Sequence, residues 1–193
     1  MISENSNLQT FSVDLGHYDK SYDRGRPGWY TLLWWLVQET LFRWTPHSFD
    51  EIRAVLLRLF GAQVGEGVKI RPTARFYYPW HVHLGDQVWI GDEVNCYSLG
   101  PITIEDQVVI SQRTYLCTGS HDIGDPHFGL IVRPIHIQSS VWVAAECFVG
   151  PGVTIGEGTV IGARSAVFRD LPAWMICFGT PCIPVKPRSL NHQ

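Results

Sequence analysis

The sequence has few cysteines and no excess of basic residues. Its five cysteines form no Cys-x-x-Cys pair, and the odd number favours reduced thiols in the cytosol over a disulfide framework. Lys and Arg number 15 against 18 Asp and Glu, which gives a formal net charge of -3. A chain without a global positive field is not expected to bind nucleic acid.

Long hydrophobic runs are also missing. The most apolar stretch, Trp29 to Trp44, has 16 residues and includes Gln38, Glu39 and Arg43. A membrane-spanning helix needs about 20 mostly apolar residues. The first residues, MISENSNLQTF, lack the basic and then apolar layout of a signal peptide. We therefore expect a cytoplasmic protein of one globular domain with a substantial core, plus a small appendage.

The N-terminal part predicts a polar arm followed by two helices. Residues 1–28 are polar with Gly and Pro near their end, and residues 29–44 favour a helix that is apolar on most sides and ends before Pro46. Ser48, with Glu51 three residues later, has the pattern of a capping box and predicts a second helix.

The second helix is expected to bury an apolar stripe. Arg53 and Arg58 lie outside that stripe, and Gly61 is suited to the C-terminal cap. The stripe itself consists of Ile52, Val55, Leu56, Leu59 and Phe60.

Beyond Gly61 an apolar residue returns every six positions. The series are Val64, Ile70, Phe76 and Val82; Leu84, Ile90, Cys96 and Ile102; Ile104, Ile110 and Leu116; and Ile137, Val143, Val149, Ile155, Ile161 and Val167. Four positions after most of these comes a mostly small residue: Val68, Ala74, Val88, Val94, Val108, Thr114, Ser120, Val141, Cys147, Val153, Thr159 and Ser165. Glycine often follows the apolar residue, as in LGDQVW and IGEGTV. Short repeats of this kind predict a triangular parallel β-helix. An antiparallel sheet is not expected, because hairpin signals such as Asn-Gly are missing.

The spacing of the series predicts a loop that leaves the coil. Successive coils start at residues 64, 84 and 104, whereas the next starts at 137, and the hexads then run unbroken. The added length is expected to form a loop over residues 122–134, with His121 at its base. Binding and catalytic residues favour loops held by a rigid scaffold.

The chain resembles the hexapeptide-repeat sugar O-acetyltransferases, and within them the colanic-acid-type exopolysaccharide acetyltransferases. The segments that carry the resemblance are YLCTGSHD, GPGVTIGEGTVIGARSAV, DLPAWMICFGTPCIPVKPR, SYDRGRP and LLRLFGAQVG. It implies a left-handed parallel β-helix of hexapeptide repeats, with two N-terminal helices and one extended loop. It also implies a homotrimer with active sites between neighbouring β-helices, acetyl-CoA as acyl donor and a sugar hydroxyl as acceptor.

The resemblance also assigns roles to individual residues. His121 corresponds to the general base of the family, and Asn95 to the asparagine that binds or polarises the reacting groups. Trp142 corresponds to the tryptophan beside the pantetheine arm, with Ala145 and Ala163 along the same channel and Lys186 near the phosphates. The family often has Thr-Lys before the DLP turn, where this chain has Phe168-Arg169, so Arg169 is a further candidate for coenzyme A.

Several candidates leave two interpretations open. Asp122 either orients the imidazole of His121 or caps the loop, and His127 in the same loop is a candidate for sugar contact. Asn95 is alternatively a corner residue that bonds to its own backbone. Trp142 contacts either the cofactor or a trimer neighbour, as exposed outward aromatic residues need a partner.

The cysteines and the Trp-rich helix are assigned mainly to structure. Cys96 and Cys117 are expected to be packing or wall residues, since neither has an evident activating base. Cys177 and Cys182 are expected to be structural rather than zinc ligands. The helix around Trp34 and Trp35 either covers an end of the β-helix or contacts the inner face of a membrane, where a lipid-linked saccharide acceptor is found.

Two other functions remain as alternatives. A γ-class carbonic anhydrase shares the β-helix trimer but needs three histidines around zinc, for which His81, His83 and His121 are the available set. The other alternative is a non-catalytic β-helix scaffold. The acetyltransferase interpretation requires no metal. Its domains are an arm and two helices over 1–62, the β-helix over 63–172 with the loop 122–134, and a C-terminal extension over 173–193.

Overall fold

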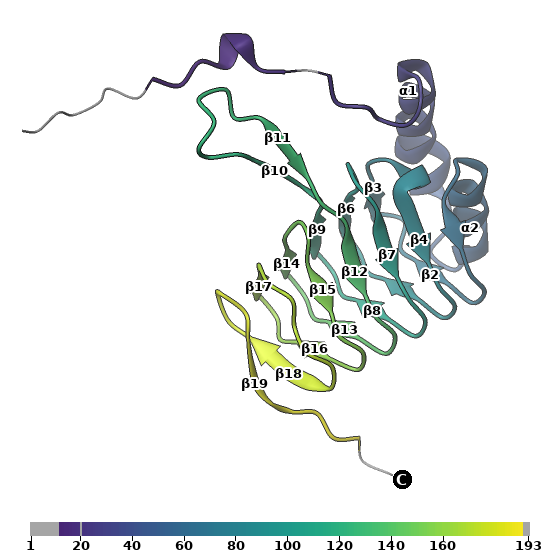
Figure 1. The fold of residues 1–193 in the computed structure, drawn as a ribbon. Helices are drawn as coiled ribbons and strands as arrows, with labels where there is room; N and C mark the ends of the chain where they lie inside the picture. Colours follow the sequence, from purple (N-terminus) through teal and green to yellow (C-terminus); the bar gives the residue numbers. More distant parts are fainter. Residues whose placement is uncertain (1–11, 20, 191–193) are drawn as a thin grey trace, which may run out of the picture.

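The computed structural model describes residues 12–19 and 21–190. The remaining residues of the predicted arm and residues 191–193 of the predicted C-terminal extension lie outside the described residues. Short strands stack into a parallel β-helix with two helices at its N-terminal end, and a hairpin projects from one coil (Figure 1).

Three sheets form the walls of the coil. Sheet A contains β1 (Gln63–Val64), β4 (Val82–Leu84), β7 (Ile102–Ile104), β12 (Ile135–Ile137) and β15 (Thr154–Ile155). Sheet B contains β2 (Lys69–Ile70), β5 (Trp89–Ile90), β8 (Val109–Ile110), β13 (Trp142–Val143), β16 (Val160–Ile161), β18 (Met175–Phe178) and β19 (Ile183–Pro187). Sheet C contains β3 (Arg75–Phe76), β6 (Asn95–Tyr97), β9 (Tyr115–Cys117), β14 (Phe148–Val149) and β17 (Ala166–Val167).

The strand register confirms the predicted coil lengths. In sheet A, Gln63 pairs with His83 and His83 with Thr103, two steps of 20 residues. Thr103 then pairs with His136 across the expected longer step, and His136 pairs with Thr154 after a regular 18 residues. The short 3-10 helix η3 (Pro79–His81) lies at a corner of the first 20-residue coil.

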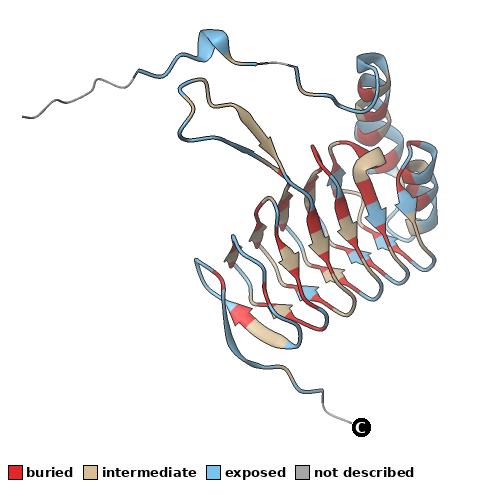
Figure 2. Cartoon of the chain, in the orientation of Figure 1, coloured by how far each residue is buried: buried red, intermediate tan, exposed pale blue. Residues whose placement is uncertain are grey.

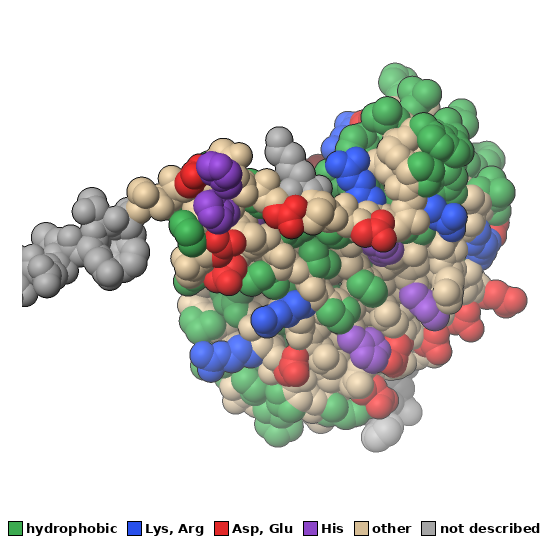
Figure 3. Space-filling view, turned by 45° about the horizontal axis from the view of Figure 1, so that its top comes forward, with side chains coloured by type: hydrophobic (Ala, Val, Ile, Leu, Met, Phe, Trp, Pro, Cys, Tyr) green, Lys and Arg blue, Asp and Glu red, His purple; other side chains and the backbone are tan. Residues whose placement is uncertain are grey.

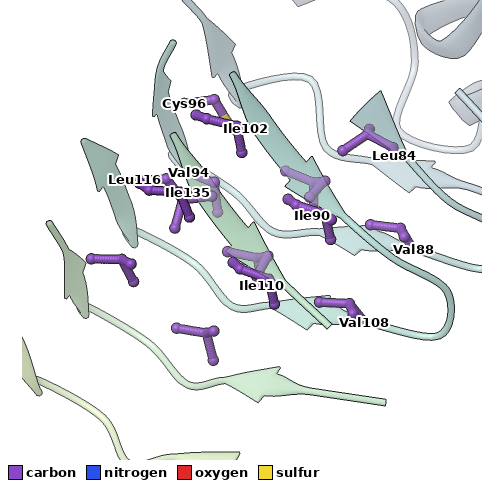
Figure 4. Close-up of a cluster of buried hydrophobic side chains, with 14 of the residues drawn as sticks. Leu84, Val88, Ile90, Val94, Cys96, Ile102, Val108, Ile110, Leu116 and Ile135 are labelled. Carbon is purple, nitrogen blue, oxygen red and sulfur yellow. The ribbon is translucent and has the colours of Figure 1, made fainter. Parts of the chain in front are cut away.

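The core is the single column of apolar side chains that the hexads predict. Ile70, Leu84, Ile90, Ile110 and Leu116 are at most 2% exposed, and Figure 4 shows such side chains stacked from coil to coil. Outward faces alternate with these buried positions along the coils (Figure 2). Of the predicted small corner residues, Ser120 is the exception, because it is exposed and belongs to the hairpin.

Close approach of the coils explains the glycines after the apolar residues. A Cβ on Gly85 would come within 2.3 Å of Asp106 Oδ1, and one on Gly91 within 2.7 Å of the Gln112 nitrogen. These positions therefore exclude a side chain, as the sequence pattern predicts.

The first predicted helix is present with a change of winding along its length. It begins as α1 (Gly28–Val37) and continues through the π-helical turn η2 (Gln38–Phe42). Trp34 Nε1–H donates to the Phe76 carbonyl at 2.7 Å, and Gln38 Oε1 accepts from the Phe76 N–H at 2.7 Å. Both backbone groups of Phe76, on the edge strand β3, are thereby satisfied from the helix.

The second helix, α2 (Asp50–Leu59), differs from the sequence prediction at its N-terminus. Phe49 is the N-cap and makes no side-chain cap bond, so the Ser48–Glu51 capping box is wrong. Glu51 instead pairs with Arg58 at 2.8 Å. At the C-terminus the prediction is confirmed: Gly61 has a φ of 91° and its N–H donates to the Arg58 carbonyl at 3.0 Å.

The predicted apolar stripe of α2 is buried only in part, through Phe60 in the core and Leu56 packed against it. Ile52 and Val55 are each 43% exposed and Leu59 is 69% exposed, whereas Arg53 is 0% exposed. Arg53 Nε–H donates to the Ile70 carbonyl at 2.6 Å, and Asp50 Oδ1 accepts from the Ile70 N–H at 3.1 Å. The helix turns Arg53 inward because the open edge of sheet B needs hydrogen-bond partners.

The edge of sheet A is satisfied in the same manner. Arg58 donates from Nε to the Val64 carbonyl at 3.0 Å and from Nη2 to the Gly65 carbonyl at 2.8 Å. The two helices thus close all three sheets at the N-terminal end of the coil.

Candidate active site

The insertion that interrupts the repeat folds as a hairpin. β10 (Gly119–His121) pairs antiparallel with β11 (Leu130–Val132), and His121 lies opposite Leu130. The hairpin therefore leaves the coil three residues earlier than predicted, and His121 stands at the end of β10 rather than at the base of the loop. The sequence does not predict this antiparallel pair, because the connecting residues lack a two-residue turn signal.

Thr118 fixes the point where the hairpin leaves the coil. Its side chain is buried, and its hydroxyl donates to the Tyr97 carbonyl at 2.8 Å while accepting from the Gly100 N–H at 2.9 Å. The Arg133 N–H donates to the Thr118 carbonyl at 2.9 Å on the return path. The hairpin is thus anchored to a rigid coil at both of its ends.

The hairpin also selects the tautomer of His121. Its Nδ1 lies 2.7 Å from the Phe128 carbonyl oxygen. A carbonyl oxygen has no proton, so Nδ1 carries the proton and donates it. In the neutral ring the lone pair is then on Nε2, which is the arrangement a general base requires. His121 is exposed and within reach of an external hydroxyl.

Two aspartates hold the tip of the hairpin. Asp122 Oδ1 accepts from the Gly124 N–H at 2.9 Å, so of its two predicted roles the loop-capping bond is the one present. The carbonyl of Phe128, not Asp122, bonds to the imidazole Nδ1. Asp125 accepts from the N–H groups of His127 and Gly129 at 2.9 and 2.8 Å, and these bonds lower its pKa.

A segment of the N-terminal arm lies over the hairpin (Figure 1). The Asp14 N–H donates to the Pro126 carbonyl at 2.9 Å, and His127 Nδ1–H donates to the Asp14 carbonyl at 2.8 Å. The short helix η1 (Leu15–His17) follows, with the Gly16 N–H donating to Asp14 Oδ1 at 3.0 Å. This Asp-x-Gly turn is a sequence signal for local order in the arm, and Asp23-Arg24-Gly25 repeats it, with the Gly25 N–H donating to Asp23 Oδ1 at 2.8 Å.

The arm and the hairpin together form a pocket beside His121. It has a volume of about 320 Å³ and is lined by Leu15, Tyr18, His121, Ile123 and Phe128. The rings of Tyr18 and His121 are 6.0 Å apart between centroids. The pocket is thus almost entirely apolar apart from the imidazole and the tyrosine hydroxyl.

Asn95 lies in a second pocket, between the first helix and sheet C. This pocket has a volume of about 490 Å³ and is lined by Trp35, Gln38, Glu39, Arg75, Phe76, Tyr77, Asn95, Tyr97 and Tyr115. Burial, followed by the neighbouring Tyr77, Cys117 and Tyr18, raises the pKa of Tyr97. Tyr97 lines the pocket of Asn95, and two of the predicted catalytic residues, Asn95 and His121, line different pockets.

Two of the five residues predicted for coenzyme A, Trp142 and Lys186, lie on strands of sheet B. The register places Trp142 beside Val160, Val160 beside Ile176, and Ile176 beside Lys186, all on one face. Three strand spacings of about 4.8 Å separate Trp142 from Lys186 by about 14 Å. Trp142 is 47% exposed, and its Nε1–H donates to Ser111 Oγ at 2.9 Å.

Ala145 and Ala163 occupy equivalent corners of successive coils. Both lie in the turn between sheets B and C, and the Arg164 N–H donates to the Ala145 carbonyl at 2.9 Å. Arg169 is exposed but lies past β17, away from the row that joins Trp142 to Lys186. The structure therefore brings the two alanines into one corner column, and leaves Arg169 apart from the sheet B row.

The cysteines have the character of wall residues. Burial raises the pKa of Cys96 to about 12, and burial also raises the pKa of Cys117. Cys117 Sγ donates to the Gly119 carbonyl at 3.1 Å. A buried thiol with a raised pKa is a poor nucleophile near neutral pH. Cys177 and Cys182 are likewise buried, and the five cysteines are free thiols.

The histidines considered for zinc do not converge within this chain. His81 Nδ1–H donates to the Ser98 carbonyl at 3.0 Å, whereas His121 belongs to the projecting hairpin. Over residues 12–19 and 21–190, no three His, Cys, Asp or Glu side chains form a group able to hold a metal ion.

Known proteins similar to this chain include acetyltransferases of one fold. No protein-family model matches the chain. It is 50% identical over 181 residues to a protein of Escherichia coli (strain K12) assigned to colanic acid biosynthesis as the acetyltransferase WcaF, covering 94% of this chain and 96% of that protein. A galactoside acetyltransferase in complex with coenzyme A superposes with a TM-score of 0.75 at 27% identity, covering 83% of this chain and 81% of that one.

A hexapeptide-repeat acetyltransferase from Vibrio cholerae O1 biovar eltor, complexed with acetyl coenzyme A, also superposes well. Its TM-score is 0.72 at 26% identity, and the match covers 83% of this chain and 86% of that one.

Proposed function

The chain belongs to the hexapeptide-repeat sugar O-acetyltransferases, and we propose on this basis that it moves the acetyl group of acetyl-CoA to a sugar hydroxyl in the synthesis of a colanic-acid-like exopolysaccharide. The observation that carries the mechanism is the Nδ1–H bond of His121 to the Phe128 carbonyl, which leaves Nε2 able to accept a proton.

His121 acts as general base in this proposal. A sugar hydroxyl is a weak nucleophile, because its pKa lies far above neutral pH. Acetyl-CoA supplies the thioester carbonyl that this hydroxyl attacks. His121 Nε2 takes the hydroxyl proton as the new C–O bond forms, and the imidazolium returns that proton to the sulfur as the C–S bond breaks. The Phe128 carbonyl stabilises the imidazolium throughout by accepting from Nδ1–H.

The developing oxyanion needs a hydrogen-bond donor. Asn95 or a backbone N–H of the hairpin serves this purpose in our proposal. Asn95 lines a pocket with Tyr97 and Tyr115, so it also suits contact with the sugar. His127 is retained as a candidate for sugar contact, although its Nδ1–H already bonds to the Asp14 carbonyl.

The cofactor is proposed to run across sheet B. Trp142 offers an exposed ring for the pantetheine arm, and Lys186 lies about 14 Å along the same row for a phosphate. Ala145 and Ala163 suit close approach of the arm because their side chains are small. The geometry supports a coenzyme A contact less for Arg169 than for Trp142 and Lys186, since Arg169 lies outside the row that joins them.

A thiol-release assay tests the reaction directly. Purified protein is mixed with acetyl-CoA and a panel of sugar acceptors, and free coenzyme A is measured against acceptor concentration. Release that depends on a sugar supports the proposal. A protein that binds no coenzyme A by calorimetry would favour the scaffold alternative, and stoichiometric zinc with carbon dioxide hydration would favour the carbonic anhydrase alternative.

We expect the chain to form a trimer. Trp89 and Trp142 are each 47% exposed on the flat outer face of sheet B, and Phe148 is partly exposed on sheet C. Three prisms around a three-fold axis bury such faces and create three equivalent clefts. Light scattering at micromolar concentration should give three times the mass of one chain. A monomer would contradict this prediction.

Shortening the hairpin should separate acceptor binding from cofactor binding. Replacing residues 122–129 with Asn-Gly keeps His121 opposite Leu130 in a two-residue turn, but removes the Phe128 carbonyl and the contacts to the arm. We expect kcat for sugar acetylation to fall at least tenfold and the acceptor KM to rise, with the Kd for coenzyme A nearly unchanged. Equal weakening of both ligands would refute an acceptor role for the hairpin.

A further inference from the structure

The first helix presents a continuous apolar face to solvent. Its inner side chains Trp34 and Phe42 are 0% exposed, yet the opposite face is apolar as well. The outer residues are Trp29, Leu32, Leu33, Leu36, Leu41 and Trp44, with exposed fractions between 42% and 82%. Most of these outer residues are three or four positions apart, which is the spacing of one helix face.

The second helix adds its own apolar stripe to the same surface. Ile52, Val55 and Leu59 follow helical spacing on a side turned away from Arg53, and the N-cap residue Phe49 is 48% exposed next to them in the sequence. Figure 3 shows the resulting cluster of hydrophobic side chains over the helical end of the molecule, with Lys and Arg side chains beside it. We call the exposed apolar residues of the two helices the helical patch.

The helical patch is not explained by the packing of this chain. The inner faces of both helices make the hydrogen bonds to the three sheet edges. The outer residues are therefore not needed to close the coil. A contiguous apolar surface of this kind marks an interaction site. Among the described residues, none forms a helix of the length and hydrophobicity needed to cross a bilayer.

Charge separates this end from the rest of the chain. Residues 21–75 carry eight Lys and Arg side chains against five Asp and Glu, whereas the whole chain carries 15 against 18. The acidic groups nearest the patch are neutralised: Glu39 pairs with both Arg43 and Arg75, and Glu51 pairs with Arg58. The helical end is therefore net positive while the remainder is net negative.

We propose that the helical patch docks on the surface of an anionic lipid bilayer, with the two helices lying in the plane of the interface. The patch is formed by the outer faces of helices, which suits insertion among acyl chains better than capture of a peptide. Trp29 and Trp44, at its two ends, have the amphipathic rings that favour the headgroup boundary. The positive helical end attracts an anionic surface, and the negative remainder is repelled from it. The proposal does not depend on the acyl transfer described above.

Vesicle co-sedimentation tests the proposal. The full chain is mixed with vesicles of phosphatidylglycerol and phosphatidylcholine in equal parts, and with vesicles of phosphatidylcholine alone. We expect binding to the mixed vesicles and clearly weaker binding to phosphatidylcholine. Leu32→Ser/Leu36→Ser should reduce binding to the mixed vesicles at least about tenfold, because two side chains no longer leave water.

Matched variants keep the test decisive. Ile183→Ser/Val185→Ser removes two similarly exposed apolar side chains from β19, at the other end of the coil, and should bind as the wild type does. Arg26→Glu/Arg43→Glu leaves the apolar area intact and should weaken binding to mixed vesicles only, even if the Leu variant fails to fold.

Three results with vesicles would overturn the proposal. These are a wild type that binds no vesicles, equal binding of the wild type to both lipid compositions, or unchanged binding after both helical variants. Light scattering without lipid is the remaining measurement. A changed oligomeric mass of the Leu variant would mean that the patch joins copies of this chain, and the bilayer assignment would then be wrong.

Discussion

His121→Ala lowers kcat by about 10²- to 10⁴-fold if the imidazole is the general base, which is the range for a positioned acid–base group. The residue is exposed at the end of β10, so its removal costs little packing and the variant should fold and assemble normally. The Kd for coenzyme A should also stay near the wild-type value, because Trp142 and Lys186 lie on another sheet. Steady-state kinetics with the best acceptor of the panel measure the loss.

Three controls isolate the proton transfer. His83→Ala changes another exposed histidine, on β4, and should leave kcat unchanged, whereas the carbonic anhydrase alternative requires that residue. Cys117→Ala should remain active, which separates direct transfer from an acyl-cysteine route. The wild-type rate should decline at acidic pH, because a protonated imidazole has no lone pair to accept a proton. A folded His121→Ala enzyme with near wild-type kcat would show that the histidine only shapes the hairpin.

Arg53→Met should destabilise the fold by about 3–5 kcal/mol, which is the scale for removing one partner from a buried charged network. The guanidinium is 0% exposed and donates to the Ile70, Pro46 and His47 carbonyls, to Thr45 Oγ1 and to Asp50. Methionine fills a similar volume but removes every one of these donors, and leaves Asp50 Oδ1 with the Ile70 N–H alone. Urea unfolding measured through the tryptophan fluorescence gives the change in free energy of unfolding.

An exposed arginine provides the comparison. Arg43 is half exposed, and its ion pair with Glu39 has a distance of 3.5 Å, so Arg43→Met should cost less than about 1 kcal/mol. Similar losses for the two variants would mean that the buried network does not hold the second helix to the coil.

The coil could be predicted from the sequence because each hexad carries the same physical information. An apolar residue such as Ile70 must point inward, and a glycine such as Gly85 must follow where the next coil leaves no space for a Cβ. Counting from Gln63 then yields the register and the position of the insertion.

The second helix was misread because periodicity identifies an apolar face but not what it faces. Of the five residues predicted to form its buried stripe, Leu56 and Phe60 pack on the core, whereas Ile52, Val55 and Leu59 are exposed. The unmet hydrogen bonds of Ile70, which appear only when the sheet edge is known, bring Arg53 inward instead. Asp50 also accepts from the Ile70 N–H, which helps to fix this orientation.

At the candidate site the residue types could be predicted but not their partners. The motif and the break in the repeat predict His121 as the candidate base, whereas the carbonyl that bonds to its Nδ1 belongs to Phe128, across an antiparallel hairpin. The contact of Asp14 with Pro126 joins residues more than 100 positions apart, and no local pattern encodes it.

The closed ends of the coil set the size of the molecule. A parallel β-helix is a template for its own growth, since any open end offers a complete set of backbone donors and acceptors to another chain. At one end Trp34, Arg53 and Arg58 occupy those groups. At the other, β19 reverses direction along sheet B, and the Ala166 and Thr154 edges bond to the Gly179–Cys182 turn and to Leu171. The hexads therefore stack within one molecule, and sheet B ends on the exposed antiparallel strand β19 rather than on a further parallel coil.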